Sequence, residues 1–251
     1  MSNKFYFLVI NFIKFLIKLL IPNFIRGKLS FIIELDTFEE ISKKILKKNK
    51  VIIFDVGSNE GQSIYKFKKN FKNCEIHAFE PMKEAFFIMN EKFKKYENIT
   101  LNQFALGEKI QERYLYENNI FSEMSSFYKI NKSKKKLRSS SIQNLVKIKT
   151  IDSYCKKKKI KFIDYLKIDV QGFEKNVLSG AKRMLKNNKI KLIEVEIIFQ
   201  NFYENVSSFY DIEKILHKNN YRLYNVKAIT YDKNQKLNQL DALFINENLK
   251  Q

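Results

Sequence analysis

Residues 51–61 read Val-Ile-Ile-Phe-Asp-Val-Gly-Ser-Asn-Glu-Gly, and this stretch decides the fold. The apolar run at 51–54 is typical of a strand that is buried on both faces of a sheet. Asp55 and Gly57 end the run, and a helical pattern from about residue 62 to 70 follows Gly61. A buried strand, a glycine-containing turn and a helix predict the first unit of an α/β fold.

The alternation of strand and helix continues along the chain. A second apolar run at 75–79 completes a βαβ unit, and further strands are predicted near 99–105, 162–168, 190–198, 221–226 and 241–245. Helical patterns lie near 83–95, 175–186 and 210–218, and a lysine- and serine-rich segment at 129–141 predicts a mobile loop or insertion. The pattern predicts an α/β fold with a mainly parallel, doubly wound sheet. We divide the chain into a helical N-terminal extension, residues 1–48, and one catalytic domain, residues 49–251.

Four acidic residues stand where predicted strands end. They are Asp55, Glu80, Asp169 and Glu196, on the first, second, fourth and fifth strands of the series. In open α/β sheets a ligand binds beyond the carboxyl ends of the strands, so we expect these side chains to meet in one crevice.

The first loop limits the kind of ligand. Gly57 and Gly61 allow a tight turn and a close approach of the backbone, and the acid that ends the second strand, Glu80, is the expected partner of ribose hydroxyls. The Gly-x-Gly-x-x-Gly pattern of dinucleotide sites is incomplete, because Asp55 holds its first position. The phosphate-binding pattern that ends in Gly-Lys-Ser/Thr is excluded, because Gln62 follows Gly61.

Taken together, the motifs resemble those of the FkbM-type methyltransferases, which use S-adenosylmethionine (SAM). The resemblance covers roughly residues 50–246, and Gln171 departs from the more frequent glutamate of that family. The matching segments are Asp55 to Ser63, Ala78 to Pro81, Asn102 with Ala105 to Gly107, Leu166 to Glu174, Val177 to Ala181, Glu196 with Tyr203, and Asp241 to Phe244.

The resemblance implies a Rossmann-like class I methyltransferase fold, in which a seven-stranded sheet has a reversed last strand, here at 241–245. It also implies SAM as methyl donor and a hydroxyl as acceptor, often on a sugar or polyketide-like scaffold. The chain would then be an O-methyltransferase (EC 2.1.1.-) acting on a saccharide or glycolipid-type acceptor in glycan biosynthesis.

The site residues follow from these positions. We expect Asp169 and Glu196 to orient the acceptor or to accept its proton, with Asp169 favoured because its motif is more distinctive. Glu196 could instead brace the backbone, and Glu174 suits the N-terminus of a helix. The predicted cofactor-binding residues are Asp55, Gly57, Ser58, Asn59, Gly61, Glu80, Pro81 and Asn102.

Other polar residues are weaker candidates for catalysis. Of the two histidines, His77 lies inside a predicted strand and His217 has no motif around it, so neither is chosen as the base. Ser125 and Ser126 could line the acceptor pocket or simply form a turn. The lysine run at 156–159 is typical of a solvated surface, with an acidic glycan or anionic lipid headgroup as the alternative partner.

The amino-acid composition further limits the possible partners and the possible metal or disulfide sites. A net charge of +20 suits an anionic partner, but no nucleic-acid-binding module accompanies it, so nucleic acid is not the expected partner. The two cysteines, Cys74 and Cys155, have neither disulfide nor metal-ligand spacing. They fit a reducing cytoplasm, and no metal site is predicted.

The N-terminal apolar segment has two interpretations. Residues 5–21 are largely apolar, and Lys4, Asn11, Lys14 and Lys18 fall on one stripe of a helix. Such a helix could lie on an anionic membrane surface, which would make the protein peripheral at the inner membrane face, or it could cover the catalytic domain or a partner.

Two other functions stay open beside methyl transfer to a hydroxyl. One is a catalytically silent, membrane-associated scaffold with the SAM-binding fold, and the other is a nucleic-acid methyltransferase. The second lacks the Asn/Asp-Pro-Pro-Tyr type of signature. The oligomeric state is not predicted.

Overall fold

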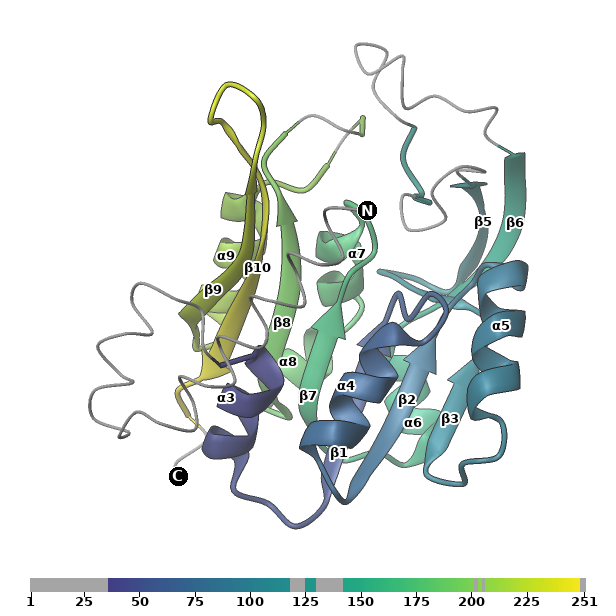
Figure 1. Ribbon diagram of the computed structural model, residues 1–251, viewed down its shortest axis with the longest axis vertical. Coiled ribbons are helices and arrows are strands. Elements are labelled where there is room, and N and C mark those ends of the chain that lie inside the picture. Colours follow the sequence, from purple (N-terminus) through teal and green to yellow (C-terminus); the bar gives the residue numbers. More distant parts are fainter. Residues whose placement is uncertain (1–35, 118–124, 130–141, 201–202, 205, 249–251) are drawn as a thin grey trace, which may run out of the picture.

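The computed structural model describes residues 36–117, 125–129, 142–200, 203–204 and 206–248 (Figure 1). The expected amphipathic segment at 5–21 and nearly all of the lysine- and serine-rich segment lie outside these residues. Within the described part, no helix is long and apolar enough to cross a membrane.

A seven-stranded sheet forms the centre of the fold, in the order β3-β2-β1-β7-β8-β10-β9. All neighbouring strands in it pair in parallel except β10, which is antiparallel to both β8 and β9. The predicted doubly wound sheet with a reversed strand at 241–245 is therefore confirmed. The strands are β1 (Val51–Val56), β2 (Cys74–Phe79), β3 (Ile99–Asn102), β7 (Ile163–Ile168), β8 (Ile190–Ile198), β9 (Tyr221–Tyr231) and β10 (Leu237–Asn246).

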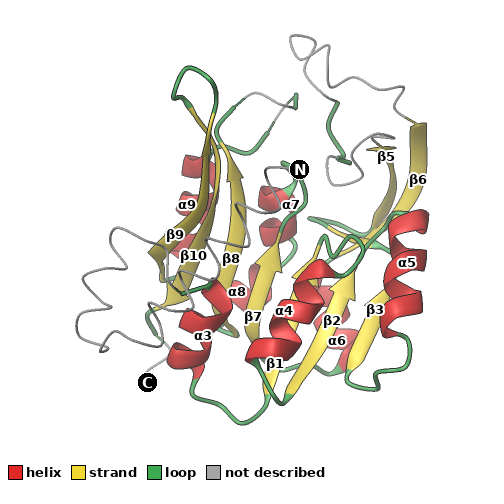
Figure 2. Ribbon diagram, viewed as in Figure 1, coloured by secondary structure: helices red, strands yellow, loops and turns green. Residues whose placement is uncertain are grey.

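Helices cover both faces of this sheet (Figure 2). One face carries α3 (Phe38–Leu46), α4 (Gln62–Asn70) and α5 (Lys83–Phe93). The other carries α6 (Ile151–Lys158), α7 (Glu174–Ser179), α8 (Lys182–Lys186) and α9 (Phe209–Lys218). The helix expected over 175–186 is thus two short helices, and α6 was not predicted at all.

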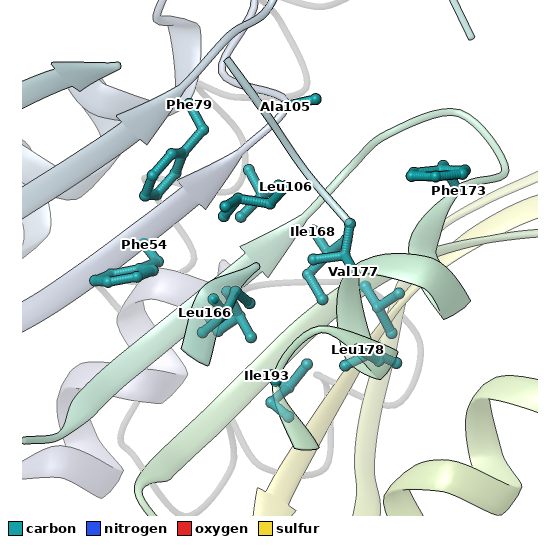
Figure 3. Packing of buried hydrophobic residues seen from close by; sticks show 14 of the residues in the cluster. Phe54, Phe79, Ala105, Leu106, Leu166, Ile168, Phe173, Val177, Leu178 and Ile193 are labelled. Atoms are coloured by element: carbon teal, nitrogen blue, oxygen red, sulfur yellow. The ribbon is translucent and has the colours of Figure 1, made fainter. Parts of the chain in front are cut away.

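Because helices cover both faces of the sheet, the central strands are buried on both faces, which explains their uninterrupted apolar sequences. Successive residues of a strand point to opposite faces, so Ile53 packs with the α4 side while Phe54 packs with the α6 side. Figure 3 shows part of the buried cluster on the α6 side, where Ile168 of β7 lies beside Val177 of α7, and Phe54 and Leu166 belong to the same cluster. Burying an apolar side chain of this size contributes about 1.5–3 kcal/mol.

A second sheet of three strands, in the order β4-β6-β5, was not predicted. The strand expected at 99–105 ends at Asn102, and Ala105 begins a strand of this second sheet instead. Tyr116 forms a bridge to Ser126, which attaches the segment 125–129 to the same sheet. Its strands are β4 (Ala105–Leu106), β5 (Gln111–Glu117) and β6 (Ile142–Lys149).

Candidate active site

Hydrogen bonds between backbone groups tie the strand ends together. Gly57 N donates to Phe79 O at 3.0 Å, Glu80 N to Asn102 O at 3.0 Å, and Asp169 N to Val56 O at 3.0 Å. These bonds bring the carboxyl ends of β1, β2, β3 and β7 to one edge, as expected for a parallel sheet. One acid differs in detail from the prediction, because Asp55 lies within β1 rather than after it, whereas Glu196 lies within β8 as the predicted strand 190–198 implies.

The turn after β1 needs its glycine at 57. Gly57 has φ +84°, and a Cβ there would lie 1.8 Å from the carbonyl oxygen of Asp169. The hydroxyl of Ser58 donates to Asp55 O at 2.7 Å and accepts from Phe79 N at 3.1 Å. The loop is therefore clamped between β1, β2 and the residue that follows β7.

Asp55 lies beneath this loop and is fully buried. Its Oδ2 accepts a hydrogen bond from Ser63 of α4, while Oδ1 has no hydrogen-bond partner among the described residues. Burial raises the pKa of Asp55, although the nearby Lys167 ammonium opposes that effect. A buried carboxylate oxygen without a partner is rare in folded proteins, which marks the base of this loop as a candidate functional position.

Glu80 holds the turn after β2. Its two carboxylate oxygens accept Asn59 N at 2.9 Å and Met82 N at 2.8 Å, so they link the first and second loops. Burial raises the pKa of Glu80 to about 7, against the effect of these two backbone donors. We call the set Gly57, Ser58, Asn59, Glu80, Pro81 and Met82 the cofactor half of the site.

Asp169 and Glu196 are brought together on the other side. Asp169 Oδ2 accepts Lys167 Nζ at 3.0 Å, and Glu196 Oε1 accepts Gln239 Nε2 at 3.0 Å. Gln171 bridges the two acids, because its Nε2 donates to Asp169 Oδ1 at 3.2 Å and to Glu196 Oε2 at 2.7 Å. We call the set Lys167, Asp169, Gln171, Glu196, Tyr203 and Gln239 the acceptor half.

The two acids differ in their ionisation. Burial opposes the charge on Asp169, but the Lys167 ammonium prevails and lowers its pKa. Burial raises the pKa of Glu196 well above its ordinary value, and Asp169 adds to the rise. Of the two acids, Asp169 is therefore the one that carries a negative charge more readily.

One cavity of about 910 Å³ contains both halves. Its size fits a nucleoside-containing ligand together with part of a second molecule. It is acidic although the chain carries a net charge of +20. Among the described residues, its titratable lining includes nine acids and two lysines: Glu39, Glu60, Glu80, Glu84, Glu117, Asp169, Glu194, Glu196, Asp241, Lys66 and Lys167.

These features fit SAM, the cofactor expected from the sequence. SAM carries a sulfonium and an ammonium group, and both cations suit a cavity that is lined by many acidic side chains. Glu80 is placed for the ribose, and Met82, Ala85 and Ile88 supply apolar surface on the same side for an aromatic base. Of the predicted cofactor-binding residues, Gly57, Ser58, Asn59, Glu80 and Pro81 line the cavity.

Asp55, Gly61 and Asn102 do not appear in the lining formed by the described residues. The side chain of Asn102 is buried and donates to Ala78 O at 3.0 Å and Thr100 O at 3.2 Å, which braces the ends of β2 and β3. Gly61 has φ +87° and begins α4. Their roles in cofactor binding remain predictions.

The weaker candidates lie as follows. His77 is buried against Tyr154 and Glu75, away from the cavity, and His217 is exposed on α9. Ser125 and Ser126 both line the cavity, whereas the lysine run at 156–159 is exposed.

Glu174 is buried at the first residue of α7 and accepts Val170 N at 3.2 Å and Gly172 N at 3.0 Å. The acceptor-half residues Lys167, Gln171, Tyr203 and Gln239 were not predicted as site residues. Next to Gln171 in the sequence, only Gly172 indicated a turn, and such a turn can direct the side chain of Gln171 into the cavity.

Several known methyltransferases are similar to this chain. No curated protein matches the chain. Similar solved structures include a putative SAM-dependent methyltransferase from Listeria monocytogenes (TM-score 0.47, 8% identity, 82% of this chain and 98% of that chain). Another is the precorrin-6y C5,15-methyltransferase of Geobacter metallireducens (TM-score 0.44, 11% identity, 84% and 87%). A methyltransferase FkbM domain matches residues 55–223, about two thirds of the sequence. The chain therefore belongs to the FkbM family of SAM-dependent methyltransferases.

Proposed function

We propose that this methyltransferase acts on a hydroxyl of a saccharide or glycolipid acceptor, and that Asp169 and Glu196 receive that hydroxyl. The observation that supports the proposal is the pairing of Asp169 with Glu196, in the same cavity as the loops of the cofactor half. A neutral hydroxyl needs a carboxylate nearby to take its proton as the new bond forms. Asp169, the ionised member, provides that carboxylate.

Bound SAM would supply an electrophilic methyl group, which the acceptor oxygen would take over from sulfur, with S-adenosylhomocysteine as the leaving group. The chain aligns the acceptor oxygen and removes its proton, which passes to the Asp169–Glu196 pair. Lys167 keeps Asp169 ionised until that proton arrives.

The polar character of the acceptor half supports a hydroxyl-rich acceptor. Tyr203, Gln171 and Gln239 line the cavity with groups that donate and accept hydrogen bonds. The acidic lining disfavours an acceptor that presents a phosphate to this half, because like charges repel at short range. Neutral sugar hydroxyls can form hydrogen bonds with these side chains and carry no negative charge.

Calorimetry with SAM and a transfer assay test this proposal. Protein with isotopically labelled SAM is incubated with the saccharide, lipid and RNA fractions of the source cells. We expect SAM binding, and label in the saccharide or lipid fraction. Label in RNA alone would indicate the nucleic-acid methyltransferase. Folded protein that does not bind SAM would contradict the enzymatic function, and the catalytically silent scaffold would then be the remaining alternative.

We further propose that the enzyme works in the cytoplasm, with residues 1–24 held on the inner membrane face. The lysine stripe and apolar face of that segment support the proposal. Deletion of residues 1–24 should abolish co-sedimentation with vesicles that contain anionic phosphatidylglycerol and leave SAM affinity intact. If the shortened protein does not fold, the result would favour the alternative in which this N-terminal segment is a helix that covers the catalytic domain.

A further inference from the structure

The turn that carries Gln171 is anchored on several sides. Gln171 has φ +53°, a left-handed conformation that few non-glycine residues adopt, and Gly172 beside it has φ +98°. The carboxylate of Glu174 accepts Gly172 N at 3.0 Å, and Ser126 Oγ donates to Gln171 O at 2.6 Å. A strained backbone that is held by so many bonds is typical of a residue whose side chain must point in one direction.

The side chain of Gln171 uses every part of its amide. Nε2 donates to Asp169 and Glu196, and Oε1 accepts the hydroxyl of Tyr203 at 3.1 Å. Only this orientation of the amide suits its neighbours, because the opposite one would place Oε1 against two carboxyl groups.

We propose that Gln171 is the positioning residue of the acceptor half, and that its amide holds Asp169 and Glu196 side by side in the orientation that meets the acceptor hydroxyl. The inference rests on the roles proposed above for Asp169 and Glu196. Gln171 acts through these two acids and takes no proton itself.

The neutrality of the amide is part of this role. The charged and titratable groups that act on the two acids come from several elements. They are Asp55 from β1, Glu80 from the turn after β2, Lys167 from β7, Glu174 from α7, Asp241 from β10, and Tyr203 from the segment after β8. Only Lys167 among them is a cation. A glutamate at position 171 would place a third carboxyl group against Asp169 and Glu196, and could donate at most one hydrogen bond in place of two.

The test compares three variants. Gln171→Glu keeps the size of the side chain and changes its charge. Gln171→Gly removes the amide but accepts the left-handed backbone without strain. The matched control is Gln235→Glu, because Gln235 is exposed in the β9–β10 turn and also has a positive φ, +61°.

The main readout is a pH titration of ¹³C-labelled carboxyl groups by NMR, on the whole chain without acceptor. In Gln171→Glu we expect Asp169 and Glu196 to titrate higher by about one pH unit or more, and in Gln235→Glu we expect no change. In Gln171→Gly, Asp169 loses a donor and should also titrate higher. Calorimetry should give SAM affinities within about threefold of wild type for all three variants, because Gln171 lies outside the cofactor half.

Turnover is measured on the fraction that wild type methylates. Gln171→Gly should lower it by about 100-fold, the loss expected for a misplaced reacting group. Unchanged titration of both acids in Gln171→Glu would overturn the inference. If Asp169→Asn and Glu196→Gln leave turnover intact, the proposed function fails instead, while the titration still reports whether Gln171 holds the two acids.

Discussion

The cofactor half and the acceptor half of one cavity are built in different ways. In the cofactor half, backbone groups of adjacent strand ends bind one another, as in the bonds of Gly57 and Ser58 to Phe79. In the acceptor half, side chains from distant segments meet, and Gln171 joins Asp169 to Glu196 and Tyr203. We infer that the first half depends on the shape of the backbone and the second on charge and on the orientation of side chains.

The largest expected effect is that of Gly57→Ala, which disturbs the backbone of the cofactor half. The new Cβ would lie 1.8 Å from Asp169 O, and both groups are fixed by the sheet. We expect a loss of about 3 kcal/mol or more in the free energy of unfolding, and no measurable SAM binding. Urea unfolding and calorimetry measure the two effects.

Gly172→Ala is the matched variant in the acceptor half. Gly172 also has a positive φ, +98°, but its nearest neighbour would be the flexible tip of Val206 at 3.3 Å. Only backbone strain remains, so we expect a loss of about 1–2 kcal/mol and normal SAM affinity. Equal effects of the two variants would contradict the proposed difference between the halves.

Asp169→Asn is expected to have the next largest effect. It should lower turnover without changing SAM affinity. The amide keeps the shape of the side chain but cannot take the acceptor's proton, so turnover should fall by about 10²–10⁴-fold. SAM affinity should stay within about threefold of wild type, as measured by calorimetry.

Asp211→Asn is the control, because Asp211 accepts Lys175 Nζ at 3.0 Å and is 37% exposed, as Asp169 is, but lies outside the cavity. A fall in SAM affinity that matches the fall in turnover for Asp169→Asn would move Asp169 into the cofactor half.

A smaller effect is expected from the ionisation of Glu80. Its pKa in the free protein is about 7, and the ionised form is the better acceptor for ribose hydroxyls and the better neighbour for a cation. SAM binding should therefore weaken as the pH falls through 7, by about tenfold between pH 8 and pH 6. Calorimetry across this range measures the change.

Glu80→Gln should bind SAM about tenfold more weakly than wild type at pH 8 and lose most of the pH dependence. A variant that keeps the full pH dependence would assign it to another acid, with Asp55 the nearest candidate because burial also raises its pKa.

The same contrast explains how much the sequence could predict. Strands β1, β2, β7 and β8 are apolar because both their faces are buried, and an acid near the end of each marks the crevice. The cofactor half lies in continuous motifs, so Gly57, Ser58, Asn59, Glu80 and Pro81 were predicted from the strand ends and from the FkbM resemblance, whereas Met82 was not. At the start of β5, by contrast, the exposed Glu112 and Tyr114 alternate with the partly buried polar residues Gln111 and Arg113. Leu115 is the one buried apolar residue of this strand, so the apolar pattern was too weak to predict the second sheet.

The acceptor half could be predicted only in part. Asp169 and Glu196 were found as strand-end acids, but their bridge depends on the left-handed backbone at Gln171 and on the place of Tyr203 after β8. Glu39 reaches the cavity from α3, which precedes the FkbM match. Contacts of this kind depend on how distant segments pack, and no local pattern encodes them.

The smallest expected effect belongs to Asn102, at the margin of the cofactor half. Its side chain braces Ala78 O and Thr100 O, so Asn102→Ala should lower the free energy of unfolding by about 1–2 kcal/mol. Thermal unfolding measures this loss, and calorimetry should show a change of less than about threefold in SAM affinity. Asn98→Ala is the control, because Asn98 Nδ2 donates to Cys74 O at 2.8 Å at the opposite ends of β2 and β3. If Asn102→Ala alone weakens SAM binding by about tenfold or more, Asn102 contacts the cofactor, and the cofactor half then depends on a side chain from β3 as well as on Glu80 and on its backbone.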